Sequence, residues 1–195
     1  MMRTAEIERQ TLETNIELSL NLDGEGQAEI ATGIGFLDHM LVLLAKHAFL
    51  DLSVKASGDL DVDSHHTVGD CGIVLGQALK QAIGNKTGMH RYGSCFLPMD
   101  EALAHVVLDF SGRPLLVWRA EIPKVVLGNL ETEMIEEFFR AVASESGLTL
   151  HVRLLYGQNT HHIVEAIFKA FARALAEAVA IDARVKGVMS SKGKL

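Results

Sequence analysis

The feature that most constrains the fold is a motif that the chain contains twice, an adjacent pair of histidines at the start of an apolar helical stretch. The first copy reads DSHHTVGDCGIVLGQAL (63–79), and the second reads NTHHIVEAIFKAFARAL (159–175). The segments that precede the two motifs also resemble each other once a short slip is allowed. A single pair of copies indicates a duplicated domain with pseudo-two-fold symmetry rather than a solenoid of many repeats.

Each half is expected to form the same ββαβα unit. In the first half, alternating apolar and polar residues predict a hairpin of strands 14–23 and 26–35, then helix 36–48, strand 50–57 and a helix capped by Asp63 or Ser64. In the second half, the corresponding elements are a hairpin of 101–110 and 114–123, a helix near 132–145, strand 148–155 and helix 160–180. The predicted fold class is an α/β (α+β) sandwich in which two duplicated units pack their sheets on four helices. The pseudo-repeats cover about 3–90 and 91–182 of a single domain, and residues 183–195 form a polar tail.

Composition argues against several classes of function. The chain has 25 acidic and 18 basic residues and a net charge of −7, which argues against a nucleic-acid or membrane partner. No apolar run is long enough for a membrane span, and the first residues lack the apolar core of a signal peptide. The two cysteines, Cys71 and Cys95, have no metal-ligand spacing, so free thiols in the cytoplasm are expected. The chain also lacks the glycine-rich loop typical of ATP or NAD sites.

The second histidine pair has the spacing of a metal site. Neighbouring residues on a helix point about 100° apart, so His161 and His162 cannot easily hold one ion together. Glu165 follows them by four and three residues and shares a helix face with either. One imidazole and this carboxylate would form a two-ligand clamp, which leaves the other imidazole for a second ion or another chain. Nitrogen and oxygen ligands without a thiolate suit Mn, Fe or Zn.

Surface or capping histidines would explain one such pair equally well, but two pairs at matching positions favour metal. His39, in FLDHML, lies in the helix before the first pair, and its counterpart in the second copy is Glu137, in MIEEFF. Either side chain is a possible further ligand. For Glu137 alone, a polar helix face is the simpler explanation.

Six motifs in order resemble the imidazoleglycerol-phosphate dehydratase family of histidine biosynthesis: GFLDHML, DVDSHHTV, RYG…PMDEAL, LDFSGRP, NTHHIVEAIFKAFARAL and SSKG. The resemblance runs essentially from end to end. It implies a lyase that dehydrates imidazole glycerol phosphate to imidazole acetol phosphate on a duplicated α/β fold. It also implies two manganese ions, and active sites formed between the subunits of a large cubic homo-oligomer of twenty-four chains.

The resemblance assigns roles to individual positions. It implies metal ligands at His39, His65, His66, Glu137, His161, His162 and Glu165. It matches Glu13 to the family's acidic residue near the substrate, and Glu13 is our candidate for the catalytic acid/base. It implies phosphate and substrate contacts at Arg91, Arg113, Lys169, Ser190, Ser191 and Lys192, the last three in a tail that would close over the ligand. Loop arginines are more often solvated charges, and an ordinary intrahelical ion pair with Glu165 would explain Lys169 equally well.

Gly69 departs from the family, which has HHTVED at this motif and therefore a glutamate at this position. Glycine supplies no ligand and costs about 1 kcal/mol relative to alanine inside a helix. The neighbouring Asp70 points about 100° away and is a poor substitute. Water in place of the carboxylate would weaken one metal, or the chain is a low-activity form, and the sequence leaves both open.

Two other classes of function compete with the lyase. A dinuclear metal hydrolase acting on a phosphorylated small molecule is compatible with the His and Glu clusters, although an Asp-rich site would be more typical of it. A metal-binding homologue with reduced or lost activity, because of Gly69, is the non-enzymatic alternative. The joint occurrence of the motifs favours the lyase.

Overall fold

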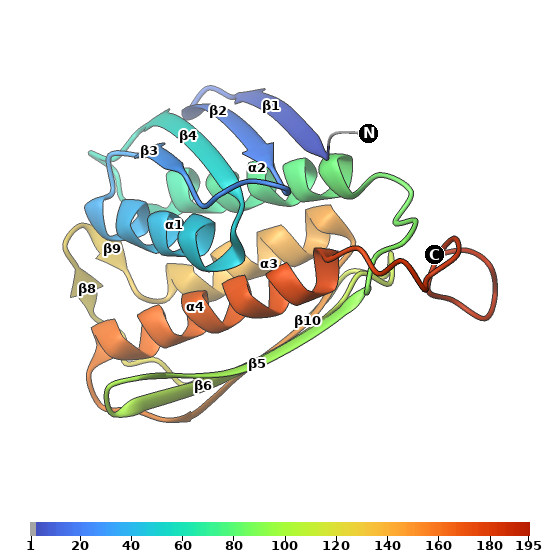
Figure 1. Ribbon diagram of the computed structural model, residues 1–195. Helices are drawn as coiled ribbons and strands as arrows, with labels where there is room; N and C mark the ends of the chain where they lie inside the picture. Colours follow the sequence, from blue (N-terminus) through green and yellow to red (C-terminus); the bar gives the residue numbers. More distant parts are fainter. Residues whose placement is uncertain (1–2) are drawn as a thin grey trace.

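Two four-stranded sheets enclose a central layer of four helices in the computed structural model, which describes residues 3–195 (Figure 1). The first half comprises β1 (Thr4–Gln10), β2 (Thr14–Asn21), β3 (Ala28–Ala31), α1 (Gly35–Ala48), β4 (Asp51–Gly58) and α2 (His65–Ile83). The second half comprises β5 (Tyr92–Met99), β6 (Ala102–Asp109), β7 (Leu115–Arg119), the short pair β8 (Val126–Leu127) and β9 (Leu130–Glu131), α3 (Met134–Ser146), β10 (Thr149–Tyr156) and α4 (Thr160–Val179). The predicted fold class, a duplicated unit with two sheets packed on four helices, is confirmed.

Strand order is equivalent in the two sheets, β1-β2-β4-β3 and β5-β6-β10-β7. In each sheet the strand named last pairs in parallel with its neighbour, whereas the other pairs are antiparallel. The two predicted hairpins are therefore wrong, because β4 lies between β2 and β3, and β10 lies between β6 and β7. Alternation of apolar and polar residues identifies a strand but not its partner, and here the partner follows a helix in the sequence.

Each half also has one strand more than predicted in its four-stranded sheet, so the repeated unit is βββαβα, and the second half has the short pair β8 and β9 in addition. The additional strands, β1 and β5, lie at the edges of their sheets. β5 contains Gly93 and Pro98, which argue against a strand in sequence, but an edge strand tolerates proline. Gly93 is needed where α4 crosses β5, because a Cβ there would lie 1.9 Å from the carbonyl oxygen of Ala174.

The helices begin and end within a few residues of the predicted bounds, and their apolar faces build the core. Phe138 and Phe139 of α3 contact Phe168 of α4, with ring centroids 5.5 and 4.9 Å apart, and all three rings are fully buried. On its other side α3 packs closely against α2 at Gly72 and Gly76, where an added Cβ would lie 2.7 and 2.6 Å from atoms of α3. The four helices are thereby held as one layer.

All four helices begin at the same end of the molecule, on the left in Figure 1, and the chain ends at the opposite end. Every histidine and glutamate predicted as a metal ligand lies in the first two turns of its helix. The fold therefore gathers these side chains at one end. In the chain from residue 3 onward, no helix is both long enough and apolar enough to cross a membrane.

Candidate active site

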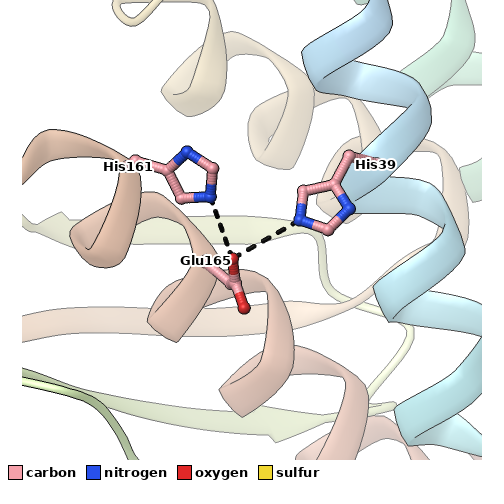
Figure 2. A group of neighbouring side chains, drawn as sticks. All are labelled: His39, His161 and Glu165. Carbon is pink, nitrogen blue, oxygen red and sulfur yellow. Dashed lines mark hydrogen bonds and ion pairs between the residues drawn. The ribbon is translucent and has the colours of Figure 1, made fainter.

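Three of the predicted metal ligands, His39, His161 and Glu165, meet between α1 and α4 (Figure 2). Oε2 of Glu165 lies 3.1 Å from Nε2 of His161 and 3.5 Å from Nε2 of His39. One ligand atom from each residue lies within 4.8 Å of the other two. Within residues 3–195, this is the one group of three metal-ligating side chains with such spacing.

The first turn of α4 fixes the direction of its two histidines. The N-cap is Asn159, whose side-chain oxygen accepts hydrogen bonds from the backbone N–H groups of His161 at 2.9 Å and His162 at 3.3 Å. Glu165 lies one turn after His161 on the same face of α4, as the four-residue spacing predicts. Contacts within α4 alone therefore place two of the three residues of this group, His161 and Glu165.

Glu165 is only 6 % exposed and yet favours its ionised form. Burial raises the pKa of this carboxyl, but the hydrogen bond and the charge of Lys169, together with a hydrogen bond from His161, outweigh burial and lower the pKa below its usual value. Nζ of Lys169 lies 2.5 Å from Oε1. Lys169 thus forms the intrahelical ion pair, and its contact with a phosphate stays a prediction.

This donor set fits a divalent metal ion. Two imidazole nitrogens face one oxygen of the carboxylate, while Lys169 neutralises the other oxygen. Imidazole and carboxylate ligands suit borderline-to-hard ions, and three protein ligands leave positions open for a substrate or for a ligand from another chain.

The second histidine of each pair makes a different contact, with a carboxylate outside the predicted site. Nδ1 of His162 lies 2.6 Å from Oε2 of Glu101, and Nδ1 of His66 lies 3.0 Å from Oδ2 of Asp59. These hydrogen bonds raise the pKa of both imidazoles. The pKa of Glu101 is lowered to about 2, first by a backbone N–H ahead of α4 and then by the imidazole.

The first copy of the motif has no equivalent group of three ligands. His65, Gly69 and Glu137 line one cavity between α2 and α3, at the place that corresponds to the group in the second copy. A Cβ added to Gly69 would meet no atom within 4 Å, so the position is open to a side chain. Oε1 of Glu137 lies 3.5 Å from Nε of Arg140, an exposed ion pair one turn along the helix.

Asp70 does not replace the missing carboxylate. Its Oδ1 lies 2.9 Å from Nε of Arg9, and its Oδ2 accepts a 2.5 Å hydrogen bond from Thr14. Both partners belong to the first sheet, so Asp70 joins α2 to that sheet. Glu13, in the turn between β1 and β2, lies at this end too, with Oε1 3.8 Å from Nε2 of His66.

Most of the predicted phosphate contacts gather in a second cavity of about 750 Å³ at the other end of the molecule. It is lined by Arg91, Arg113, Ser190, Ser191 and Lys192, with other residues of the tail. The guanidinium of Arg91 donates to both oxygens of Asp109, at 2.6 and 3.0 Å, and this pairing raises the pKa of Arg91. Its third hydrogen bond, 2.7 Å to the carbonyl oxygen of Met189, attaches the tail to β5.

A long distance separates the group of His39, His161 and Glu165 from the phosphate cavity within one chain. The backbone N–H of Arg91 donates to the carbonyl oxygen of Ala178, in the last turn of α4, whereas His161 lies in its first turn. Seventeen residues of helix separate these positions, about 26 Å at 1.5 Å per residue. No small molecule with three carbons between an imidazole and a phosphate spans that distance.

Asp59 and Glu101 are the residues of this region that reasoning from sequence missed. Glu101 directly precedes β6 as Glu13 precedes β2, so an alignment of the two copies at their strand starts would have indicated it. Asp59 follows β4, and nothing in the local sequence distinguishes it from a solvated loop acid.

Comparison with known proteins supports the family resemblance that the sequence motifs suggested. The sequence model of one family, described as imidazoleglycerol-phosphate dehydratase, matches residues 32–175, which is more than half of the chain. The chain belongs to the imidazoleglycerol-phosphate dehydratase family. A curated relative of that name from Acetivibrio thermocellus is 62 % identical over 195 residues, covering 100 % of both chains. Another, from Clostridium acetobutylicum, is 58 % identical over 193 residues, or 99 % of this chain and 98 % of the relative.

Solved structures of imidazoleglycerol-phosphate dehydratases have the same fold. The enzyme from Staphylococcus aureus superposes with a TM-score of 0.84 at 44 % identity, covering 92 % of this chain and 99 % of that one. The enzyme from Pyrococcus furiosus, solved in complex with (S)-C348, gives a TM-score of 0.83 at 35 % identity, covering 97 % and 100 %. The family predicted from the sequence motifs is therefore confirmed.

Proposed function

We propose that this chain removes water from imidazole glycerol phosphate to give imidazole acetol phosphate, with two manganese ions and with active sites shared between chains. As a member of the dehydratase family, it is a lyase of histidine biosynthesis. The observation that supports this function most directly is the full-length match to relatives of that name, in a chain whose His39, His161 and Glu165 converge. The manganese, the shared sites and the residue roles below are the parts that need testing.

The metal-ligating end of the molecule would bind the imidazole of the substrate. Divalent ions held there would supply Lewis acidity to the azole ring. One ion would be held by His39, His161 and Glu165. The other predicted ligands would bind the second ion, or would complete the first site from another chain; these are His65, His66, His162 and Glu137. Glu165 needs no proton removed on metal binding, because Lys169 already favours its ionised form.

The reaction also requires a group that moves protons. One proton leaves a carbon that carries a hydroxyl, and the hydroxyl on the neighbouring carbon leaves as water after gaining a proton. The resulting enol then loses its O–H proton and gains a proton on the carbon that lost its hydroxyl, which gives the ketone. Glu13 would be this acid/base, because its carboxylate is half-exposed and lies 3.8 Å from an imidazole nitrogen of His66. The phosphate would bind away from the reacting carbons, at Arg113, Ser190, Ser191 and Lys192, with Arg91 and Lys169 as further contacts.

The separation of the two cavities supports a homo-oligomer. A substrate held at once by an imidazole cluster and by the Arg113 cavity needs these groups from different chains, because within one chain they lie at opposite ends of α4. The large cubic assembly of twenty-four subunits implied by the sequence resemblance meets this requirement. We also propose that the protein acts in the cytoplasm, where the free thiols of Cys71 and Cys95 would be stable.

Metal removal tests the proposed function. The purified protein is treated with a chelator and assayed for conversion of imidazole glycerol phosphate, with and without added Mn²⁺, alongside the variant Glu165→Gln. We expect activity to disappear with the metal, to return with Mn²⁺, and to fall at least ten-fold in the variant. Full activity after verified metal removal would contradict the proposal. Metal binding without turnover would instead select the inactive homologue, and release of inorganic phosphate would select the hydrolase.

A further inference from the structure

Two carboxylates outside the predicted ligand set contact the same ring atom of equivalent histidines. Asp59 lies 3.0 Å from Nδ1 of His66, and Glu101 lies 2.6 Å from Nδ1 of His162. These histidines are the second members of their pairs, which the duplication makes equivalent. Each ring is thus held on the same side by a carboxylate.

The two carboxylates come from different parts of the duplicated unit. Asp59 follows β4, and the residue that follows the equivalent strand, β10, is Gly157. Glu101 precedes β6, and its counterpart before β2 is Glu13, which faces the opposite nitrogen of His66. Duplication alone therefore does not explain the shared contact, since each copy supplies it from another element.

A carboxylate at Nδ1 determines which ring nitrogen carries the proton. A neutral imidazole has one N–H donor and one lone pair, and an ionised carboxylate only accepts. The proton therefore stays on Nδ1, and the lone pair is on Nε2. Metal-ligating histidines usually have this arrangement, in which an outer carboxylate orients the ring.

We propose that Asp59 and Glu101 are positioning residues that keep the proton of His66 and His162 on Nδ1 and so present Nε2 of each ring as a metal ligand. This inference rests on the metal dependence of the proposed function. It extends that function by assigning a role to Asp59 and Glu101, to which the sequence motifs assigned no role.

The geometry of Glu101 makes the inference testable with a nearly isosteric change. Its Oε1 accepts hydrogen bonds from the backbone N–H groups of Gln158 and Asn159, at 3.1 and 2.7 Å, while Oε2 contacts His162. In Glu101→Gln the amide oxygen can keep the two backbone contacts, so the amide nitrogen faces Nδ1. Because that nitrogen is a donor, the imidazole proton is forced onto Nε2, where it blocks the lone pair.

The experiment measures Mn²⁺ binding to metal-free protein by the EPR signal of the free ion, together with thermal unfolding. We expect Glu101→Gln and Asp59→Asn to weaken Mn²⁺ binding by about ten- to a hundred-fold, with little change in the melting temperature of the metal-free protein. Glu101→Ala should in addition lower that melting temperature, because it also loses the backbone contacts.

Two controls separate proton placement from charge. Asp100→Asn removes a charge beside the same ring, but its carboxylate lies 3.6 Å from Nε2 rather than at Nδ1. Glu17→Gln makes the same chemical change on the exposed face of β2. We expect Asp100→Asn to weaken binding much less than Glu101→Gln, and Glu17→Gln to leave it unchanged. The inference would be overturned if Glu101→Gln bound Mn²⁺ as tightly as the unaltered protein, or if Asp100→Asn lost as much affinity as Glu101→Gln. If the unaltered protein did not bind Mn²⁺ at all, the metal dependence itself would be overturned.

Discussion

At the scale of single residues, Gly69 and Glu165 show how far the two copies have diverged. Both follow the first histidine of a pair by four residues, but only Glu165 completes a group of three ligands. The cavity beside His65 has a carboxylate elsewhere, on Glu137 of α3, at the position where the group beside His161 has His39 of α1. The two candidate sites therefore differ in donor number as well as in kind, and they should bind metal with different affinity.

Restoring the missing carboxylate should strengthen the weaker site. A Cβ added at position 69 would meet no atom within 4 Å, so nothing obstructs a side chain where it leaves the helix. We expect Gly69→Glu to tighten the weaker Mn²⁺ site at least ten-fold, because it adds a third ligand beside His65. Titration with Mn²⁺ and elemental analysis measure this. Gly69→Gln is the matched control, since it fills the same space without the charge, and equal affinities in the two variants would show that position 69 is not a ligand position.

Most of the residues of the metal end could be predicted from sequence, because helix geometry relates His161 to Glu165 directly. The meeting of His39 with Glu165 could not be derived from spacing, since it depends on how α1 packs on α4. The duplicated helices indicated His39 only as a possible further ligand, and the family resemblance implied both residues as ligands. Glu101 lies 61 residues from His162, so no local pattern joins them, although an alignment of the two copies at their strand starts places Glu101 opposite Glu13. Asp59 lies only seven residues before His66, but in the loop ahead of α2, where its sequence does not distinguish it from a solvated acid.

At the scale of elements, α2 contains one glycine with space for a side chain and others that have no such space because α3 packs against them. Gly76 faces α3, where an added Cβ would lie 2.6 Å from Cβ of Glu145 and 2.9 Å from the carbonyl oxygen of Val142. Gly69, two turns earlier on the same helix, faces open space. Helix propensity favours alanine at both positions, so packing alone distinguishes them.

Replacing each glycine by alanine should therefore change stability in opposite directions. We expect Gly76→Ala to lower the free energy of unfolding by about 1–3 kcal/mol, because the helices must separate. Gly69→Ala should raise it by about 0.5–1 kcal/mol through helix propensity. Urea unfolding at fixed protein concentration, in the absence of metal, measures both. A stabilising Gly76→Ala would mean that α2 and α3 are less closely packed than described.

The strands illustrate what local patterns leave undetermined. Alternation located β2, β4, β6 and β10, which are half-buried, and the same signal is weak in the edge strands β1 and β5. The order of the strands was wrong because β3 and β7 pair with strands that come later in the chain, beyond a helix. Helices were easier to predict, since their hydrogen bonds and their apolar period are both local.

At the scale of the whole molecule, the distance between the imidazole end and the phosphate cavity determines how an active site can be built. The two lie at opposite ends of α4, so under the proposed function one chain would supply half of each of two sites. A shared site makes activity a property of the assembly. It also predicts that defects in different halves are complementary.

Mixing two inactive variants tests this arrangement. Glu165→Gln removes a ligand at the imidazole end, and Arg113→Ala removes a cation of the phosphate cavity. We expect each variant alone to be nearly inactive, whereas assemblies formed by co-expression should recover part of the activity, because some sites draw both intact halves from different chains. Recovery in the mixture and not in either parent, measured by turnover of imidazole glycerol phosphate, supports shared sites. A mixture no more active than its parents would show that each site lies within one chain.

The common starting point of the four helices has an electrostatic consequence. Each helix macrodipole carries about half a positive elementary charge at its N-terminus, and here the four N-termini lie at one end of the molecule (Figure 1), where the histidine pairs occupy the first turns of α2 and α4. A cation bound there would be opposed by this field, so every nearby carboxylate, from Glu165 to Glu137, would also offset the repulsion. We therefore expect the lack of an acid at Gly69 to weaken cation binding by more than the loss of a single bond, whereas an anionic ligand entering this end would be attracted by the same field.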